Sequence, residues 1–297
     1  MYPDRVFGLF YMYGLMIAIG LVMAFVVLFY YGKKKGVEDK FIDFIFYNGI
    51  LSIIVGFGSA TLFQAFYNYL ENPSAGFNLG NGFTFIGGLI GGVICFLIIY
   101  FFARKRYKTR LTDVLSAPPC CIMIGHAFGR IGCFFAGCCY GKETDSFLGV
   151  QFPHLPNPVH PTMLYESAFL FILFGITFYL LMKKNFRHNM SVYLIAYGIF
   201  RFCNEYLRGD HRGELVGNIS PSQFWSLAMI VLGVALYFLL EYLRKHRPTP
   251  LMLQAQGVAV EEPSETEEKP SEKVLIAVET KEMVENEEES KETEAEQ

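Results

Sequence analysis

The segment at residues 129–141, GRIGCFFAGCCYG, combines one arginine with three cysteines among glycines and large apolar side chains. A guanidinium group carries five N–H donors in a planar fork, which suits the oxygens of a phosphate. Thiolates bind soft metal ions, and a thiol beside a cation becomes more reactive. The segment is therefore compatible with three kinds of site: an anion pocket around Arg130, a metal centre, or a reactive thiol.

Of these three, a metal centre is disfavoured. Cys133, Cys138 and Cys139 could be joined by His126 as a fourth ligand. The segment has no C-x-x-C pair, however, and adjacent cysteines fit poorly around one tetrahedral ion. A disulfide between adjacent cysteines is strained, which also disfavours a redox pair. We expect no metal here, while a thiol activated by Arg130 stays open.

Two further groups of polar residues lie in otherwise apolar stretches. Arg201 and Glu205 are four residues apart, so on a helix they lie on one face and can pair. The segment HPTMLYE at 160–166 ends a proline-rich loop and enters an apolar run. His160 is a candidate base because histidine titrates near neutral pH, and it could equally anchor a helix at a membrane surface.

The elements that must position these residues are membrane-spanning helices. Of 297 residues, 53% are hydrophobic and only 18% are charged, which is a balance typical of integral membrane proteins. About 20 apolar residues are needed to cross the hydrocarbon layer. Seven stretches meet this need and predict an all-α fold of seven transmembrane helices, at residues 6–31, 44–70, 83–103, 114–136, 162–182, 190–207 and 215–240.

Lysine and arginine cluster on alternate connections between these spans. Residues 33–40, 104–110, 183–188 and 244–247 contain 4, 5, 3 and 3 of them, respectively. Such clusters mark the cytoplasmic side of a membrane protein. The pattern predicts an N-terminus outside and a C-terminus inside.

The chain is expected to consist of two parts. Residues 1–247 form the seven-span domain, whereas residues 248–297 contain 15 Glu and 4 Lys. A segment with this composition buries too little apolar surface to fold alone. We expect residues 248–297 to be an acidic, disordered cytoplasmic tail.

Four Arg and Glu residues fall inside the predicted spans: Arg130, Glu166, Arg201 and Glu205. A charge at the centre of a span costs about 3 kcal/mol, so such residues face a polar cavity and mark a function, or form an internal ion pair. Arg130 has no acidic neighbour in its own segment and needs a partner from elsewhere. Because both arginines lie in the outward halves of their spans, the pattern suggests a site for an anionic lipid head group.

The run FTFIGGLIGG at 83–92 contains four glycines. In a membrane helix, such spacing favours close helix packing. A role for Gly87 and Gly88 beside a ligand is the second interpretation.

With several motifs in order, the chain resembles the prolipoprotein diacylglyceryl transferases, which are seven-span enzymes of the bacterial inner membrane. The motifs are YGLM at 13–16, GGLIGG at 87–92, GRIG within 129–141, HPTMLYE at 160–166, YGIFRFCNEYLR at 197–208 and ISPSQFWSLAMIVLG at 219–233. The resemblance covers residues 11–243. It implies a membrane-embedded helical body with a small periplasmic head, which should be reduced here because the loop before residue 160 is short.

This resemblance implies the first step of lipoprotein maturation. The diacylglyceryl group of phosphatidylglycerol would pass to the lipobox cysteine of a prolipoprotein signal peptide and form a thioether. The implied partners are these two substrates and the surrounding membrane lipids, with no nucleic acid. No metal or organic cofactor is implied.

The resemblance also assigns residues. Arg130 and Arg201 match family arginines that hold the lipid phosphate, which is the role that their chemistry suggested. Further matches give a catalytic set, Tyr13, His160, Tyr197 and Glu205, and a substrate-binding set, Arg208, Gly141, Gly87, Gly88, Cys133 and Cys138.

The chain departs from the family pattern at several positions. The better-known members of the family have Asn where Cys133 stands and Glu where Cys138 stands, and they have His where Ile86 precedes the GGLIGG run. The missing histidine leaves the proton acceptor open. Tyr13, Tyr197 or an oxygen of the lipid head group are candidates.

Two other functions stay open. The departures would fit a diverged transferase with another thiol acceptor or another lipid donor. The intramembrane arginines would also fit a protein that binds or transports lipids or anions without chemistry. Seven spans without an evident internal repeat disfavour a typical transporter.

Overall fold

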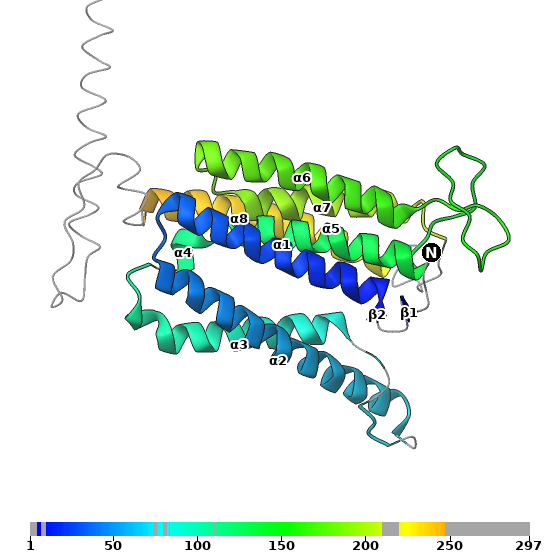
Figure 1. The fold of residues 1–297 in the computed structure, drawn as a ribbon, viewed down its shortest axis with the longest axis horizontal. Helices are drawn as coiled ribbons and strands as arrows, with labels where there is room; N and C mark the ends of the chain where they lie inside the picture. Colours follow the sequence, from blue (N-terminus) through cyan, green and yellow to red (C-terminus); the bar gives the residue numbers. More distant parts are fainter. Residues whose placement is uncertain are drawn as a thin grey trace, which may run out of the picture. The chain divides into compact units, whose positions relative to one another are not determined.

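We describe the protein from a computed structural model that covers residues 5–6, 10–73, 76–79, 82, 84–109, 111–209 and 220–246. Within these ranges the regular elements are helices, apart from two short antiparallel strands, β1 (Arg5–Val6) and β2 (Phe10–Tyr11) (Figure 1). The predicted all-α class is confirmed. The predicted acidic tail, residues 248–297, lies outside the described residues.

The chain divides into two compact units, and each is described by itself. The first comprises Met1–Asn189 with Cys203–Gly213, and the second comprises Met190–Phe202 with Glu214–Gln297. The helices of the first unit are α1 (Met12–Lys35), α2 (Asp39–Glu71), α3 (Phe85–Ala103), η2 (Arg104–Arg106), α4 (Leu111–Val114), α5 (Pro118–Ala136) and α6 (Thr162–Lys184).

Local sequence explains where the helices of the first unit begin and end. Helix α5 starts with two prolines. Proline lacks a backbone N–H, and this costs no hydrogen bond in the first turn of a helix, where the N–H groups have no partner within the helix. It ends at Gly137, whose φ of 68° is a left-handed conformation that glycine adopts without strain. Helix α1 ends in the same way at Gly36, after three lysines that suit the negative end of the helix dipole.

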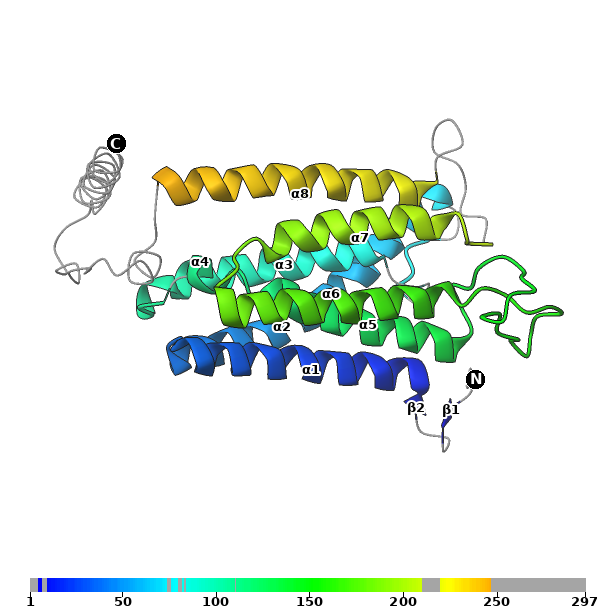
Figure 2. The same ribbon diagram turned by 90° about the horizontal axis from the view of Figure 1, so that it is seen from above.

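Helix α5 packs against both α1 and α6 in the first unit (Figures 1 and 2). Gly20 of α1 permits this approach, because a Cβ there would lie 2.9 Å from the carbonyl oxygen of Gly125. On the other flank, Ser167 of α6 donates a hydrogen bond of 3.0 Å to the carbonyl oxygen of Ala127. The helix that carries Arg130 is thereby held from two sides.

Helices α2 and α3 form a second close pair in this unit. A Cβ on Gly56 would lie 3.0 Å from the carbonyl oxygen of Gly88, and a Cβ on Gly87 would lie 2.5 Å from the Cβ of Phe63. These glycines let the two backbones approach, as expected for small residues in membrane helices. The packing interpretation of the GGLIGG run is confirmed, and contact of Gly87 and Gly88 with substrate stays a prediction.

The glycine contact makes a testable prediction about stability. Gly87→Ala should lower the free energy of unfolding by about 1–3 kcal/mol, because the added methyl group overpacks the contact with Phe63. Gly58→Ala on α2 is the matched control, since a Cβ there meets no atom within 4 Å. Unfolding of both variants in detergent measures the difference. Equal stability of the two variants would contradict the packing role.

The second unit contains most of α7 (Asn189–Glu205) and all of α8 (Pro221–His246), which lie side by side in Figure 2. A reciprocal cap begins α8: the N–H of Gln223 donates to Ser220 Oγ at 3.2 Å, and the N–H of Ser220 donates to Gln223 Oε1 at 3.1 Å. Gly198 of α7 faces α8, where its added Cβ would lie 2.9 Å from the carbonyl oxygen of Ser226. Within the ISPSQFW motif, Ser220 is therefore the cap of a helix that starts at Pro221.

Six helices of the described chain are long and apolar enough to cross a membrane: α1, α2, α3, α5, α6 and α8. They confirm six of the seven predicted spans, and the protein is a multi-pass membrane protein. The predicted span at 190–207 corresponds to α7, which has 17 residues and is not among the six. Several helix starts also differ from the prediction: α1 begins at Met12, and α5 begins after the short α4 rather than at residue 114.

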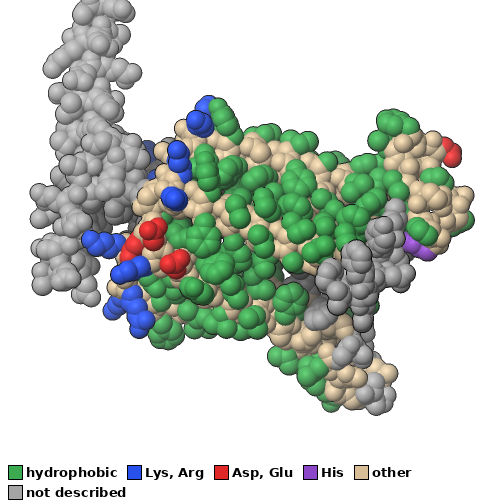
Figure 3. Space-filling view, viewed as in Figure 1, with side chains coloured by type: hydrophobic (Ala, Val, Ile, Leu, Met, Phe, Trp, Pro, Cys, Tyr) green, Lys and Arg blue, Asp and Glu red, His purple; other side chains and the backbone are tan. Residues whose placement is uncertain are grey.

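The side chains of the first unit separate by type along its helices. Large apolar side chains on the flanks are exposed, including Val22, Ile54 and Phe102, as expected for surfaces that face lipid. Lys and Arg gather at one end (Figure 3), where α1 and α6 end in lysines and η2 carries three basic residues. The opposite end has no comparable basic cluster among the described residues of this unit.

A small head lies between α5 and α6, at residues 137–161. Phe152, Val159 and Met163 form its buried core, on which Phe134 and Leu155 also pack. Short bridges connect the head internally, between Glu143 and Val159 and between Val150 and Val159. The expected small head is present as a compact structure with its own core.

Candidate functional site

Arg130 forms an ion pair between two helices. Its Nε lies 3.0 Å from Oε1 of Glu166 on α6 and 3.2 Å from Nε2 of His126, one turn earlier on α5. The single Nε–H is shared, so the imidazole Nε2 acts as an acceptor. The partner that Arg130 lacked within its own segment is therefore Glu166. The guanidinium carries four more N–H donors on its Nη atoms.

Burial differs sharply between the two members of this pair. The side chain of Glu166 is 1% exposed, whereas that of Arg130 is 21% exposed. A buried carboxylate needs a partner, and the guanidinium supplies one. The pair orients the edge of Arg130 that carries Nε, and the exposed part of the side chain is accessible to a ligand.

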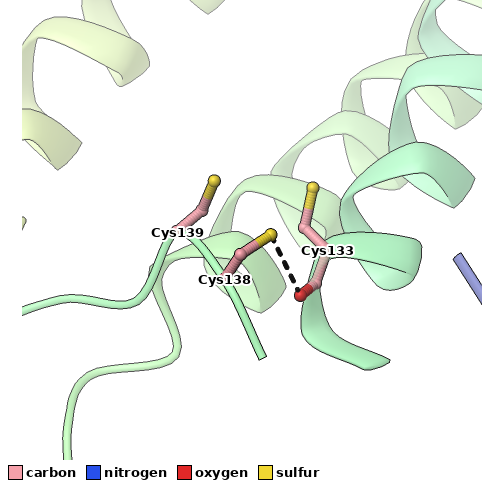
Figure 4. A group of neighbouring side chains, drawn as sticks. All are labelled: Cys133, Cys138 and Cys139. Atoms are coloured by element: carbon pink, nitrogen blue, oxygen red, sulfur yellow. Dashed lines mark hydrogen bonds between the residues drawn. The ribbon is translucent and has the colours of Figure 1, made fainter. Parts of the chain in front are cut away.

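Three thiols gather where α5 ends. The sulfur atoms of Cys133, Cys138 and Cys139 all lie within 4.8 Å of one another, and Figure 4 shows them facing one side. The thiol of Cys138 also donates to the carbonyl oxygen of Cys133 at 3.6 Å. All three cysteines are free and half-buried. The sequence analysis had grouped these three cysteines as possible ligands with His126, and the structure brings the three thiols together.

Charged neighbours act on this thiol cluster. Hydrogen bonds with the thiols of Cys133 and Cys138, followed by the guanidinium of Arg208, lower the pKa of Cys139. Arg130 and Tyr13 interact electrostatically with Cys133 and Cys138.

The ring of Tyr13 also packs on α5, where a Cβ added to Gly132 would lie 3.2 Å from Tyr13 Cδ2. The structure thus brings together Arg130, Tyr13, Cys133, Cys138 and Arg208 from the predicted set.

Arg208 is itself held by a carboxylate. Its Nε lies 3.8 Å from Oε2 of Glu205, and both side chains are almost fully buried. The neighbouring Asn204 donates to the carbonyl oxygen of Thr162 at 3.4 Å, which ties the end of α7 to the start of α6. Asn204 was missed by the sequence analysis, although it lies inside the quoted YGIFRFCNEYLR motif.

Gly141 and His160 contribute to the architecture of the head. The N–H of Gly141 donates to the carbonyl oxygen of His160 at 2.7 Å, and a Cβ on Gly141 would lie 2.5 Å from the carbonyl oxygen of Leu207. His160 Nδ1 lies 3.1 Å from the hydroxyl of Tyr165. Gly141 also borders a recess of about 300 Å³, lined by Tyr140, Gly141, Lys142, Glu143, Leu155, Val159 and Gly209. The geometry gives Gly141 a packing role, and its contact with substrate stays a prediction.

In the second unit, Arg201 is 8% exposed and donates from Nη2 to Ser222 Oγ at 3.1 Å. The sequence analysis did not predict Ser222 as a site residue. Its place directly after Pro221, the residue that begins α8, marks it as part of a helix start. Tyr197 stacks on Tyr193, with ring centroids 5.6 Å apart. In the structure, Arg201 is therefore hydrogen-bonded to a serine hydroxyl on α8, the neighbouring helix of its own unit.

The fold and the site define a multi-pass membrane protein with arginines, buried carboxylates and thiols at one end of an apolar helical body. The sequence profile of the family described as prolipoprotein diacylglyceryl transferase matches residues 7–239. The chain belongs to this family.

Three relatives illustrate the match, and each is named a phosphatidylglycerol–prolipoprotein diacylglyceryl transferase. The protein from Clostridium tetani is 38% identical over 243 residues, which cover 78% of this chain and 94% of the relative. The Clostridium perfringens protein, whose name carries the number 2, is 35% identical over 244 residues, which cover 78% of this chain and 92% of the relative. That from Coxiella burnetii strain Dugway is 34% identical over 233 residues, with 74% and 87% covered.

Proposed function

We propose that this chain transfers the diacylglyceryl group of phosphatidylglycerol to the cysteine thiol of a prolipoprotein, the lipobox cysteine of its signal peptide. The name of the relatives contains both substrates. The observation that carries the proposal is Arg130, a partly exposed guanidinium held by a buried carboxylate inside an apolar helical body. Such a group is suited to the phosphate of a lipid.

The proposed reaction is a displacement at carbon. The acceptor thiol loses its proton and attacks the glycerol carbon that carries the phosphate. A carbon–sulfur bond forms, the carbon–oxygen bond breaks, and its electron pair stays on the departing glycerol phosphate. Because negative charge grows on that phosphate, a guanidinium already in place lowers the barrier.

We assign the residues as follows. Arg130 holds the phosphate through its Nη atoms, while Glu166 and His126 fix the edge that carries Nε. Arg201 is assigned to the same phosphate on the strength of its sequence motif. The remaining predicted residues are proposed to support the site: Tyr13, His160, Tyr197, Glu205, Arg208, Gly141, Gly87, Gly88, Cys133 and Cys138.

We further propose that α7 is the seventh span. Its 17 residues are about 25 Å long at 1.5 Å per residue, which is close to the ~30 Å hydrocarbon layer. Seven spans place the termini on opposite sides, with the basic end of the first unit in the cytoplasm and the head in the periplasm. The location is then the cytoplasmic (inner) membrane, with membrane lipids around residues 1–247 and residues 248–297 as a cytoplasmic tail.

The function is tested with purified protein, phosphatidylglycerol micelles and a peptide containing a lipobox cysteine. Mass spectrometry should find the peptide heavier by one diacylglyceryl group, held by a bond that resists thioester cleavage. Complementation of cells depleted of their own transferase is the cellular counterpart. A peptide that stays unmodified while phosphatidylglycerol is bound would instead support a non-catalytic lipid-binding protein.

A further inference from the structure

The three thiols at the end of α5 have the geometry of a metal-binding site. Their sulfur atoms lie within 4.8 Å of one another. A zinc–sulfur bond of about 2.3 Å places the sulfurs of one tetrahedral site about 3.8 Å apart. Each sulfur of Cys133, Cys138 and Cys139 therefore needs to move by less than about 1 Å to bind one ion.

The backbone explains how two adjacent cysteines can face the same ion. Gly137 ends α5 with a φ of 68°, and Cys139 has a φ of 64°. In an extended chain, successive side chains point to opposite sides. The left-handed turn at Cys139 reverses this and brings its sulfur beside that of Cys138, as Figure 4 shows. A residue other than glycine rarely adopts this conformation, so the surrounding structure enforces it.

Two guanidinium groups lie beside the cluster. Arg208 forms a side-chain hydrogen bond with Cys139, and Arg130 lies near Cys133 and Cys138. Three thiolates around a divalent ion carry one net negative charge, which these groups would balance. Partners of this kind stabilise bound ligands from outside. Within the described part of the chain, the cluster contains these three side chains and no fourth. Three protein ligands with one open position is the pattern of catalytic rather than structural zinc.

We propose that Cys133, Cys138 and Cys139 bind one thiophilic divalent ion of the zinc class, whose open position takes the acceptor thiol. The second half of this statement rests on the proposed function. The incoming thiol binds as a thiolate and releases its proton to solvent, because a coordinating thiol is deprotonated outright. Its sulfur then attacks the glycerol carbon as described above, and the metal ends the step unchanged.

The metal site is tested with Co²⁺ as a spectroscopic probe. The full chain is purified in detergent, reduced and freed of metal, and then titrated while the visible and thiolate charge-transfer bands are recorded. We expect saturation at one equivalent with the intense bands of a tetrahedral ion. The variant Cys133→Ser/Cys138→Ser/Cys139→Ser should lose these bands, and the control Cys95→Ser/Cys203→Ser should keep them. Bands that survive in the triple variant, or a disulfide among the three cysteines in the purified protein, would overturn the proposal.

A single substitution covers the case in which the triple variant fails to fold. Cys138→Ser alone should weaken Co²⁺ binding by at least about tenfold while the thermal unfolding midpoint of the metal-free protein stays near that of the parent. Unchanged affinity in this variant would speak against the site.

The open position is tested separately with the lipobox peptide. Adding the peptide to the Co²⁺-loaded protein should shift the bands toward those of four sulfur ligands, and a peptide with Ser in place of Cys should not. Transfer that is independent of metal would overturn the role of the open position. If no transfer occurs at all, the proposed function fails, whereas the Co²⁺ spectra still decide the metal site.

Discussion

Replacing Arg130 by lysine should reduce the rate of diacylglyceryl transfer by about 100-fold or more, which is the loss typical of removing one preorganised charged donor from a reacting site. Lysine keeps the charge, but a single ammonium group cannot bind Glu166 through one edge and a phosphate through the other. Initial rates in phosphatidylglycerol micelles measure the effect. The loss should appear at saturating lipid as well, because the contact strengthens as the phosphate departs.

The matched control for this substitution is Arg104→Lys. Arg104 lies at the basic end of the first unit, with its guanidinium carbon 4.5 Å from the centre of the Phe101 ring. This variant should transfer at the rate of the parent. An Arg130→Lys protein with that same rate would refute the assignment of Arg130 to the phosphate.

Replacing Glu166 by leucine should lower the free energy of unfolding by about 3 kcal/mol, because the partly buried guanidinium of Arg130 loses its partner. The effect should lie at the lower end of the range for buried pairs, since Arg130 is partly exposed and can recover some hydration. Transfer should fall as well, because the orientation of the guanidinium is no longer fixed. Unfolding by denaturing detergent, followed by circular dichroism, measures the first effect.

Two comparisons make this prediction specific. Glu166→Gln keeps an oxygen that can accept the Nε–H of Arg130, so it should be less damaging than leucine. Glu143→Gln, in the exposed part of the head, alters only a hydrogen bond to Asn157 and should change stability by less than about 0.5 kcal/mol. A leucine variant as stable as the parent would show that the ion pair does not stabilise the fold.

The sequence was informative wherever a single physical requirement dominates. Long apolar stretches predicted the six helices that can cross a membrane, because a helix satisfies its backbone hydrogen bonds within one segment. The same reasoning predicted that Arg130 needs a partner from another helix, since an isolated charge there is too costly. The glycines of the GGLIGG run were expected to pack, and they do.

The sequence was less informative wherever the outcome depends on tertiary contacts. The gathering of Cys139 with two other thiols depends on a left-handed residue that no local pattern requires. The interaction of Arg208 with Cys139 joins segments about 70 residues apart, so no spacing rule could find it. Adjacent cysteines were expected to fit poorly around one ion, and this stays a prediction. The left-handed conformation of Cys139 is nevertheless found where the three sulfurs lie within 4.8 Å of one another.

The hydrogen bonds around Gly141 have a mechanical consequence. Its N–H binds the carbonyl oxygen of His160, and the neighbouring N–H of Lys142 binds that of Leu207 at 2.7 Å. Residues 141–142, His160 and Leu207, which are far apart in the sequence, are thereby joined by backbone hydrogen bonds beside the head. These hydrogen bonds fix the separations of the three stretches, so their amide hydrogens should be among the slower to exchange with solvent in this part of the unit.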